Sequence, residues 1–353
     1  MYLIQDIVAN HTGNFFTYDS GYDPTDTAKN FRLLEEGTDQ PAPEQYPFNL
    51  IDRLNPEHAE ADVYHWTPQV IDYADRYQEL NYSMGHLSDI NTANPLVIQT
   101  LKESYRFWID EVGVDGFRVD TAILVEHEFW RRFLHDDDGI YAHAKDAGKS
   151  HFLTFGEVTS VSDPYEDSGE VMVSSYIGDE GGPLFNSMLG YPLYSDIKNV
   201  IAYGTPTEHL AYRMQKFMDA YPDPFVIPNF VDNHDTPRFL SAGHGAALRQ
   251  ALALLFTIPG IPTIYQGTEQ GMTETRKAMF AGGYQNESGS FNPESEFYTY
   301  ISQLTELRRS HRALSRGDLE VLASDEYGPG LLAYRREYEG DVVVVLMNTA
   351  DHD

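Results

Sequence analysis

Apolar residues recur at regular spacing from about residue 94 onward, and this pattern predicts alternating helices and strands. In residues 94–112 apolar side chains return every three or four positions, as in an amphipathic helix. Further helices are predicted from about residue 126 and over 208–221, 246–257 and 296–311. Strands are predicted over 1–8, 114–119, 151–158, 225–231 and 261–265. After Gly317 strands follow one another without helices, which predicts a parallel α/β barrel followed by a β domain.

Residues 12–84 interrupt this pattern. They are polar, rich in Tyr and Pro, and show little periodicity, so we expect an inserted subdomain there. The expected layout is a barrel over 1–11 and 85–315, the insertion over 12–84, and a partial C-terminal β domain over 316–353.

The composition is that of a globular but strongly acidic chain. Its 353 residues include 55 Asp and Glu against 24 Lys and Arg, a formal net charge of −31, and 41% are hydrophobic. Such a surface repels phosphate backbones and anionic lipids, so neither a nucleic acid nor a membrane partner is expected. No run of about 18 apolar residues could cross a bilayer. The chain has no cysteine, which excludes disulfides and thiolate metal sites.

Only 7 of the 24 basic residues are lysines. Two interpretations of this acidic surface stay open: adaptation to salt, or a secreted or marine protein of low isoelectric point. Salt screens repulsion among carboxylates, with a Debye length of about 3 Å at 1 M, so stability is expected to rise with added salt. The apolar N-terminus has neither the basic start nor the cleavage site of a signal peptide.

Polar clusters follow four of the predicted strands. They are Asp6-Ile7-Val8-Ala9-Asn10-His11, Arg118-Val119-Asp120, Gly156-Glu157 and Asp232-Asn233-His234-Asp235. In a (β/α)8 barrel the carboxyl ends of the strands face the active site, so these side chains are expected to converge. A single strand-end Asp is more often a helix cap. Four clusters together favour glycoside chemistry, in which one carboxylate attacks and another acts as acid and then base.

These segments resemble the signature regions of glycoside hydrolase family 13, the α-amylase family. The family motifs D-x-x-x-N-H, G-F-R-x-D and N-H-D correspond to residues 6–11, 116–120 and 233–235. The pattern G-I-P-x-I-Y-x-G-x-E matches residues 260–269, and a looser region lies at 86–91. The resemblance runs from residue 3 to beyond 340. It implies an α/β fold, a (β/α)8 TIM barrel with a subdomain inserted after strand three and a C-terminal β-sandwich.

By this resemblance Asp120 is the nucleophile, Glu157 the general acid/base and Asp235 the transition-state stabiliser. Arg118 lies two residues before Asp120, on the same face of one strand, and should keep Asp120 ionised. The expected substrate-binding residues are His11, Arg118, His234 and Asp6, with Asp6 mainly orienting its neighbours. Arg238 is expected to hold the loop after Asp235 through an ion pair.

The resemblance also implies a structural calcium ion between barrel and insertion, with Asn10 as a ligand, because oxygen atoms suit calcium. The family often has Lys-His three and four residues after the nucleophile, where this chain has Ile123-Leu124. The backbone carbonyl of Leu124 can still serve as a ligand. The acidic run 136–139 lacks the spacing of a calcium loop and is expected to be a solvated loop. No organic cofactor is expected.

The expected function is retaining hydrolysis of α-1,4-glucosidic bonds in starch-like glucans or maltooligosaccharides. The alternatives are a cyclomaltodextrinase or α-glucosidase, a transglycosylase on the same site, an inactive fragment and a non-catalytic relative. In the family the first motif lies on the third barrel strand, but only ten residues precede His11. The barrel is therefore expected to be truncated by two strand–helix units. A secreted or periplasmic location is slightly favoured, because the chain has no cysteine. Oligomeric state stays open.

Overall fold

The computed structural model describes residues 1–34 and 43–350, which divide into two compact units. Unit 1 comprises residues 1–159 and 176–186, and unit 2 comprises 160–175 and 187 onward. Residues 35–42 of the predicted insertion and 351–353 of the predicted C-terminal domain lie outside the described residues. Among the described residues, no helix is both long and apolar enough to span a membrane.

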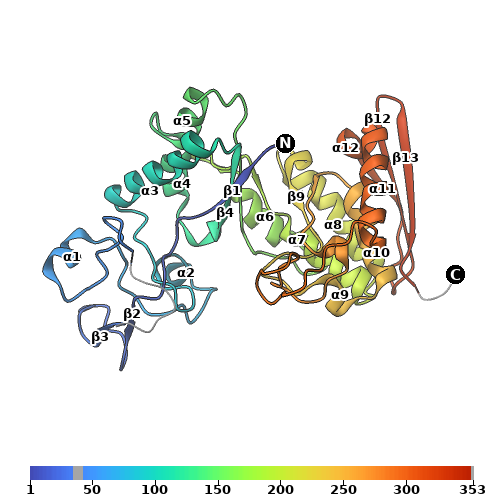
Figure 1. Ribbon diagram of the computed structural model, residues 1–353. Helices are drawn as coiled ribbons and strands as arrows, with labels where there is room; N and C mark the ends of the chain where they lie inside the picture. Colours follow the sequence, from blue (N-terminus) through green and yellow to red (C-terminus); the bar gives the residue numbers. More distant parts are fainter. Residues whose placement is uncertain (35–42, 351–353) are drawn as a thin grey trace. The chain divides into compact units, whose positions relative to one another are not determined.

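Unit 1 contains short parallel strands, two antiparallel strand pairs and several helices (Figure 1). Its strands are β1 (Ile4–Val8), β2 (Phe16–Tyr18), β3 (Phe31–Leu33), β4 (Gly116–Asp120), β5 (Leu153–Gly156), β6 (Gly178–Asp179) and β7 (Gly182–Pro183). Its helices are α1 (Pro56–Ala61), α2 (Arg76–Asn81), α3 (Pro95–Phe107), α4 (His127–His135) and α5 (Ile140–Asp146). A π-helical turn covers Trp108–Val112, and a 3₁₀ turn covers Ala122–Leu124.

Strand β4 lies between β1 and β5 and is parallel to both. Its side chains alternate: Phe117 and Val119 are fully buried in the core, while Arg118 and Asp120 point to the other face. The register pairs Asp6 with Arg118 on neighbouring strands. Parallel strands in register bring their carboxyl ends to one edge, which is the arrangement that the predicted barrel requires.

Helix α3 confirms the amphipathic pattern predicted over residues 94–112. Asn94 caps the helix by accepting a hydrogen bond from the backbone N–H of Leu96, and Pro95 occupies the first turn. One face buries Val97, Ile98 and Leu101. The regular α-helix ends at Phe107, earlier than predicted, because the chain continues as a π-helical turn to Gly113.

The predicted insertion has an aromatic core of its own. The hairpin β2–β3 contributes Phe16 and Phe31, whose rings pack against Trp66 with centroids 5.3 and 5.8 Å away. Tyr64 completes the cluster, and all four side chains are buried. These contacts explain why the segment folds without the helical or strand periodicity seen elsewhere.

Unit 2 combines helices with two sheets. Its helices are α6 (Ser168–Ser175), α7 (Tyr191–Ile197), α8 (Thr207–Ala220), α9 (Phe239–Ala242), α10 (Gly245–Thr257), α11 (Glu296–Ser310) and α12 (Arg312–Arg316). Its strands are β8 (Ser187–Met188), β9 (Pro228–Asn229), β10 (Ile261–Pro262), β11 (Asp318–Ala323), β12 (Leu331–Tyr338) and β13 (Asp341–Asn348). Shorter turns are Lys198–Ala202, Pro224–Val226 and Thr268–Gln270.

Strands β9 and β10 are parallel, and β11, β12 and β13 form an antiparallel sheet with α12 packed beside it (Figure 1). The predicted helices α8, α10 and α11 are confirmed to within one residue at each end. The strands predicted after Gly317 are confirmed as well, and in the described residues they form one three-stranded sheet. Strands β9 and β10 are much shorter than the predicted ranges 225–231 and 261–265.

Candidate functional site

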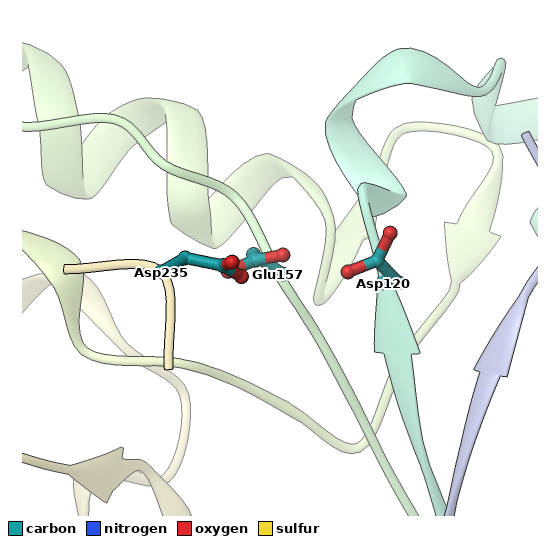
Figure 2. A group of neighbouring side chains, drawn as sticks. All are labelled: Asp120, Glu157 and Asp235. Atoms are coloured by element: carbon teal, nitrogen blue, oxygen red, sulfur yellow. The ribbon is translucent and has the colours of Figure 1, made fainter. Parts of the chain in front are cut away.

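The candidate site in unit 1 is built on the carboxyl ends of β1, β4 and β5. Asp120 is the last residue of β4, and Glu157 follows β5 directly (Figure 2). The backbone N–H of Glu157 donates to the carbonyl of Val119, 2.9 Å away, so the parallel pairing continues to the catalytic candidates. Carboxylate oxygens of Asp120 and Glu157 lie within 4.8 Å of each other.

Arg118 connects three carboxylates of this site. Its Nη1 donates to Asp120 Oδ1 at 2.7 Å and to Asp6 Oδ1 at 2.9 Å. Its Nη2 donates to Glu157 Oε2 at 2.8 Å. Burial lowers the pKa of Arg118, but the surrounding carboxylates, Glu157 first, more than offset burial and raise it overall. The guanidinium is thus a permanent positive charge that fixes the carboxylates of Asp120 and Glu157 relative to each other.

The buried Glu157 and the partly buried His11 complete this part of the site. Glu157 is only 3% exposed, so its carboxyl lies in a nearly dry environment. The ring of His11 faces Asn10, with Nδ1 3.0 Å from Oδ1. Burial lowers the pKa of His11, and the charge of Asp120 opposes this effect in part. The structure therefore brings together Asp6, His11, Arg118, Asp120 and Glu157, as the sequence predicts.

The backbone after Asp120 takes an uncommon conformation. Thr121 has φ 45° and ψ 37°, in the left-handed region that β-branched residues rarely adopt. This residue turns the chain out of β4 into the 3₁₀ turn Ala122–Leu124. Backbone conformations of this kind recur at functional sites.

Asp235 (Figure 2) lies in unit 2, in the loop after β9, and His234 precedes it in the same loop. The side chain of Asn233 organises this loop, because its Oδ1 accepts hydrogen bonds from the backbone N–H groups of Asp235 and Thr236 at 2.9 and 2.8 Å. His234 Nε2 lies 2.9 Å from Asp235 Oδ2. The N-H-D motif thus forms a compact turn in which Asn233 and His234 fix the position of Asp235.

Arg276 is a site residue that sequence reasoning missed. Its Nη2 contacts Asp235 Oδ1, and its Nε donates to the backbone carbonyl of His234 at 3.0 Å. No local pattern signals this role, because Arg276 lies in a long segment without periodicity after β10. Only the path of that segment brings the guanidinium to Asp235.

Arg238 holds its loop as expected, but through hydrogen bonds and ring stacking in place of the expected ion pair. Its side chain is fully buried, stacks on the ring of Tyr265 at 4.0 Å, and donates to the backbone carbonyls of Gln266 and Glu274 at 2.7 and 3.1 Å. Arg238 therefore holds the loop by hydrogen bonds to carbonyl oxygens and by ring stacking. The acidic run 136–139 is also more engaged than predicted, because Asp136 and Asp138 both bind the buried ammonium of Lys102.

The surroundings of Asn10 do not fit a calcium ion. The Nδ2 group of Asn10 donates to Asp89 Oδ1 at 2.9 Å and to the carbonyl of Leu124 at 3.2 Å. His65 Nδ1 lies 2.5 Å from the other oxygen of Asp89. Calcium requires six to eight oxygen ligands at about 2.3–2.6 Å. Here the oxygens that would serve already have nitrogen donors from the protein.

Comparison with known proteins identifies the family of the chain. A family model described as "Alpha amylase, catalytic domain" matches residues 1–296. A cyclomaltodextrinase of Thermoanaerobacter pseudethanolicus is 28% identical over 302 residues, which cover 82% of this chain and 46% of the relative. A cyclomaltodextrin glucanotransferase of Geobacillus stearothermophilus is 32% identical over 272 residues, covering 74% of this chain and 34% of the relative. The chain thus spans less than half the length of these curated relatives.

Solved structures show the same fold. The α-amylase of Anoxybacillus superposes with a TM-score of 0.72 at 24% identity, covering 99% of this chain and 65% of the other. The α-amylase of Geobacillus thermoleovorans, solved with acarbose, also gives 0.72 at 24% identity, with 99% and 66% covered. Together with the family model, these neighbours imply a TIM-barrel fold. The chain belongs to the α-amylase family, glycoside hydrolase family 13.

Proposed function

We propose that this chain is a retaining glycoside hydrolase that cleaves α-1,4-glucosidic bonds of starch-like glucans or maltooligosaccharides. The observation that carries the proposal is the pair Asp120 and Glu157, whose carboxylate oxygens lie within 4.8 Å and share Arg118. Retaining glycosidases hold their two carboxyl groups about 5–5.5 Å apart, whereas inverting enzymes leave about 6.5–9.5 Å for a water molecule. The spacing favours double displacement.

In the first step of the proposed reaction, Asp120 attacks the anomeric carbon while protonated Glu157 gives its proton to the departing glycosidic oxygen. This forms a covalent glycosyl ester on Asp120 and releases the leaving sugar. In the second step Glu157 removes a proton from water, which attacks the anomeric carbon and frees Asp120. Arg118 donates to both carboxylates and fixes their directions, so that attack and proton transfer are aligned.

We extend the proposal to the other predicted residues. Asp235 binds sugar hydroxyls more tightly in the distorted transition state than in the ground state, which is how a non-reacting carboxylate accelerates the reaction. His11 and His234 donate to hydroxyls of the sugar at the scissile bond, and Asp6 orients Arg118. In this proposal β1, β4 and β5 are barrel strands three, four and five, residues 12–84 are the inserted subdomain, and the β11–β13 sheet belongs to a C-terminal sandwich.

The relatives favour a second candidate within the same chemistry. Two of them, from Thermoanaerobacter pseudethanolicus and Geobacillus thermopakistaniensis, are named cyclomaltodextrinases, at 28% and 30% identity. Ring opening of a cyclic maltooligosaccharide uses the same two carboxylates and differs only in how the substrate is held. Transglycosylation differs from hydrolysis only in the second step, where a sugar hydroxyl takes the place of water.

The test is release of reducing ends from soluble starch, maltoheptaose and β-cyclodextrin by the parent chain and by Asp120→Asn. The parent should be active and Asp120→Asn should lose at least about 10⁴-fold in kcat, since the nucleophile is removed. Asp137→Asn, an exposed substitution outside the site, is the matched control and should behave as the parent. Equal activity of the parent and Asp120→Asn, or a folded parent inactive on all three substrates, would overturn the proposal.

Product lengths, determined by chromatography of the same reactions, separate the candidates. Longer products than the substrate would indicate transglycosylation, and preferential loss of β-cyclodextrin would indicate ring opening. A ladder of shorter maltooligosaccharides from starch would support hydrolysis of linear glucans.

A further inference from the structure

The loop that follows Asp120 is held at two neighbouring carbonyl groups, one bound by Asn10 and the other by Arg76 of the inserted segment. The first is the carbonyl of Leu124, which accepts a hydrogen bond from Asn10 Nδ2 at 3.2 Å. The same Nδ2 group donates to Asp89 Oδ1 at 2.9 Å. Asn10 and Asp89 are 2% and 1% exposed, so these bonds lie in the interior of unit 1.

The remaining polar atoms of this group also have partners. The second oxygen of Asp89 lies 2.5 Å from His65 Nδ1, and Asn10 Oδ1 lies 3.0 Å from His11 Nδ1. The network is therefore satisfied by protein nitrogen atoms. Buried polar groups need such partners, because an unsatisfied one costs about 1–3 kcal/mol.

The second fastening point is the carbonyl of Ile123, one residue earlier. Arg76, at the start of α2, donates to it through Nη1 at 2.9 Å. The Nη2 group of Arg76 donates to the hydroxyl of Tyr176 at 2.6 Å, and that hydroxyl donates to the same Ile123 carbonyl at 2.8 Å. Glu79, 2.5 Å from Arg76 Nη1, balances the charge. Burial raises the pKa of Tyr176 to about 12, so its hydroxyl keeps its proton.

A calcium ion at Asn10, Asp89 and Leu124 would have to break both hydrogen bonds of the Asn10 amide and the contact of His65. It would also share the loop with the permanent charge of Arg76, which binds the adjacent carbonyl. What a bridging cation supplies, namely positive charge and a link between two segments, is already supplied by side chains of the chain.

We propose that Arg76, Asn10 and His65 together form an ion-free clamp, which joins the inserted segment to the Ile123–Leu124 turn in place of a calcium ion. In this proposal Arg76 is a positioning residue, because it holds the Ile123–Leu124 turn that follows Asp120. The effect of the clamp on catalysis rests on the proposed function. The claim that the clamp holds without calcium does not depend on the proposed function.

The first test measures calcium directly on the full chain. After treatment with EDTA and dialysis, the midpoint of thermal unfolding is recorded with and without 1 mM calcium chloride, and binding is followed by calorimetry. The clamp predicts the same midpoint in both and no heat of binding. A midpoint that rises by several degrees with calcium, or one bound equivalent of calcium in the chain as purified, would overturn the proposal.

The variant Asn10→Asp sharpens this test. It replaces the bridging amide by a carboxylate against Asp89, which leaves two acids in contact without a donor between them. The clamp predicts a lower unfolding midpoint than the parent and a rise on adding calcium that the parent lacks. A parent that responds to calcium as strongly as Asn10→Asp would contradict the clamp.

Arg76→Gln and Arg76→Lys test the positioning role, and they remain informative if Asn10→Asp fails to fold. Arg76→Gln loses the cation at Ile123, so kcat should fall about tenfold while KM changes little, and Arg76→Lys should recover part of the loss. Neither variant should respond to calcium. A loss confined to KM, or restoration of Arg76→Gln by calcium, would overturn the positioning role. An inactive parent would count against the proposed function, while the calcium measurements would still decide the clamp.

Discussion

At the scale of single residues, arginines control the geometry of the candidate carboxylates in both units. Arg118 binds Asp6, Asp120 and Glu157 through two nitrogen atoms, which a lysine ammonium could not do with the same fixed directions. Arg276 contacts Asp235 and the carbonyl before it. Each guanidinium thus fixes the direction of a carboxylate as well as its charge.

The contact of Arg276 with Asp235 leads to a prediction about catalysis. Arg276→Gln should lower kcat about tenfold and change KM less, because Asp235 loses the group that orients it. Lys277→Gln is the matched control, since its neighbouring ammonium pairs with Glu274 instead. The measurement is kcat on maltoheptaose for both variants, for Asp235→Asn and for the double variant.

If Arg276 acts through Asp235, Arg276→Gln should add almost nothing to the loss caused by Asp235→Asn. Losses that multiply in the double variant would mean that Arg276 acts independently of Asp235. Because Arg276 is 64% exposed in its side chain, its removal should leave the unfolding midpoint nearly unchanged.

Sequence reasoning predicted the carboxylates and missed Arg276 for a physical reason. Asp120 and Arg118 share a strand, so their common direction follows from a spacing of two residues. Glu157 ends a neighbouring strand, and parallel pairing carries it to the same edge. Arg276 reaches Asp235 across 41 residues through an irregular segment. Its contact depends on a loop path that no periodic pattern encodes.

At the scale of elements, one buried arginine of α8 in unit 2 holds the segment before α6 and helices α6 and α7. Arg213 on α8 is 1% exposed and binds Glu170 and Asp196, with distances of 2.5 and 2.7 Å. It also donates to the backbone carbonyls of Asp163 and Glu166. Helices α6, α7 and α8 therefore share one buried charge cluster.

Arg213→Met should destabilise the chain by about 3–5 kcal/mol, because two acids remain buried without their counter-charge. Lys216→Met on the same helix is the control, and its partly exposed pair with Asp167 should contribute no more than about 1 kcal/mol. The measurement is the free energy of unfolding by urea at several pH values.

The loss of stability in Arg213→Met should depend on pH with a definite sign. Burial raises the pKa of Asp196, although Arg213 opposes this effect, so removal of Arg213 should raise that pKa further. A buried acid with a raised pKa takes up a proton in the folded chain before it does so in the unfolded chain. The deficit of Arg213→Met should therefore shrink as the pH falls from 7 toward 4. A deficit below 1 kcal/mol, or one that grows on acidification, would contradict the cluster's role.

The accuracy of element prediction follows from the strength of the local pattern. Helices α8, α10 and α11 are long and amphipathic, and their ends match the prediction to within one residue. Strands β9 and β10 are only two residues long, since Pro228 and Pro262 lack the N–H that a ladder needs. A 3₁₀ turn over Pro224–Val226 occupies part of the range predicted as strand.

At the scale of the whole molecule, the net charge of −31 dominates the response to solvent. Repulsion among carboxylates opposes the compact state, and salt screens it. Raising sodium chloride from 0.05 to 1 M at pH 7 should raise the unfolding midpoint by a few degrees. The same series at about pH 4, where many carboxylates are protonated, should give a smaller rise. A midpoint that falls with salt at pH 7 would contradict this account.

Composition and motifs predicted the class of fold and chemistry, but not the interior of the insertion or its link to the barrel strands. The aromatic cluster of Phe16, Phe31, Tyr64 and Trp66 joins residues up to 50 positions apart without periodicity. Asn10 was predicted as a calcium ligand because of its place in a motif. Its bonds to Asp89 and Leu124 depend on contacts 79 and 114 residues away.

The central claim is that Asp120 forms a covalent bond to the sugar. The most direct measurement is mass spectrometry of the chain after reaction with 5-fluoro-α-D-glucosyl fluoride, followed by digestion and peptide sequencing. Our account predicts one added glycosyl group on the peptide that contains Asp120, and none in Asp120→Asn. A chain that hydrolyses maltooligosaccharides but carries the label on another carboxylate would contradict it.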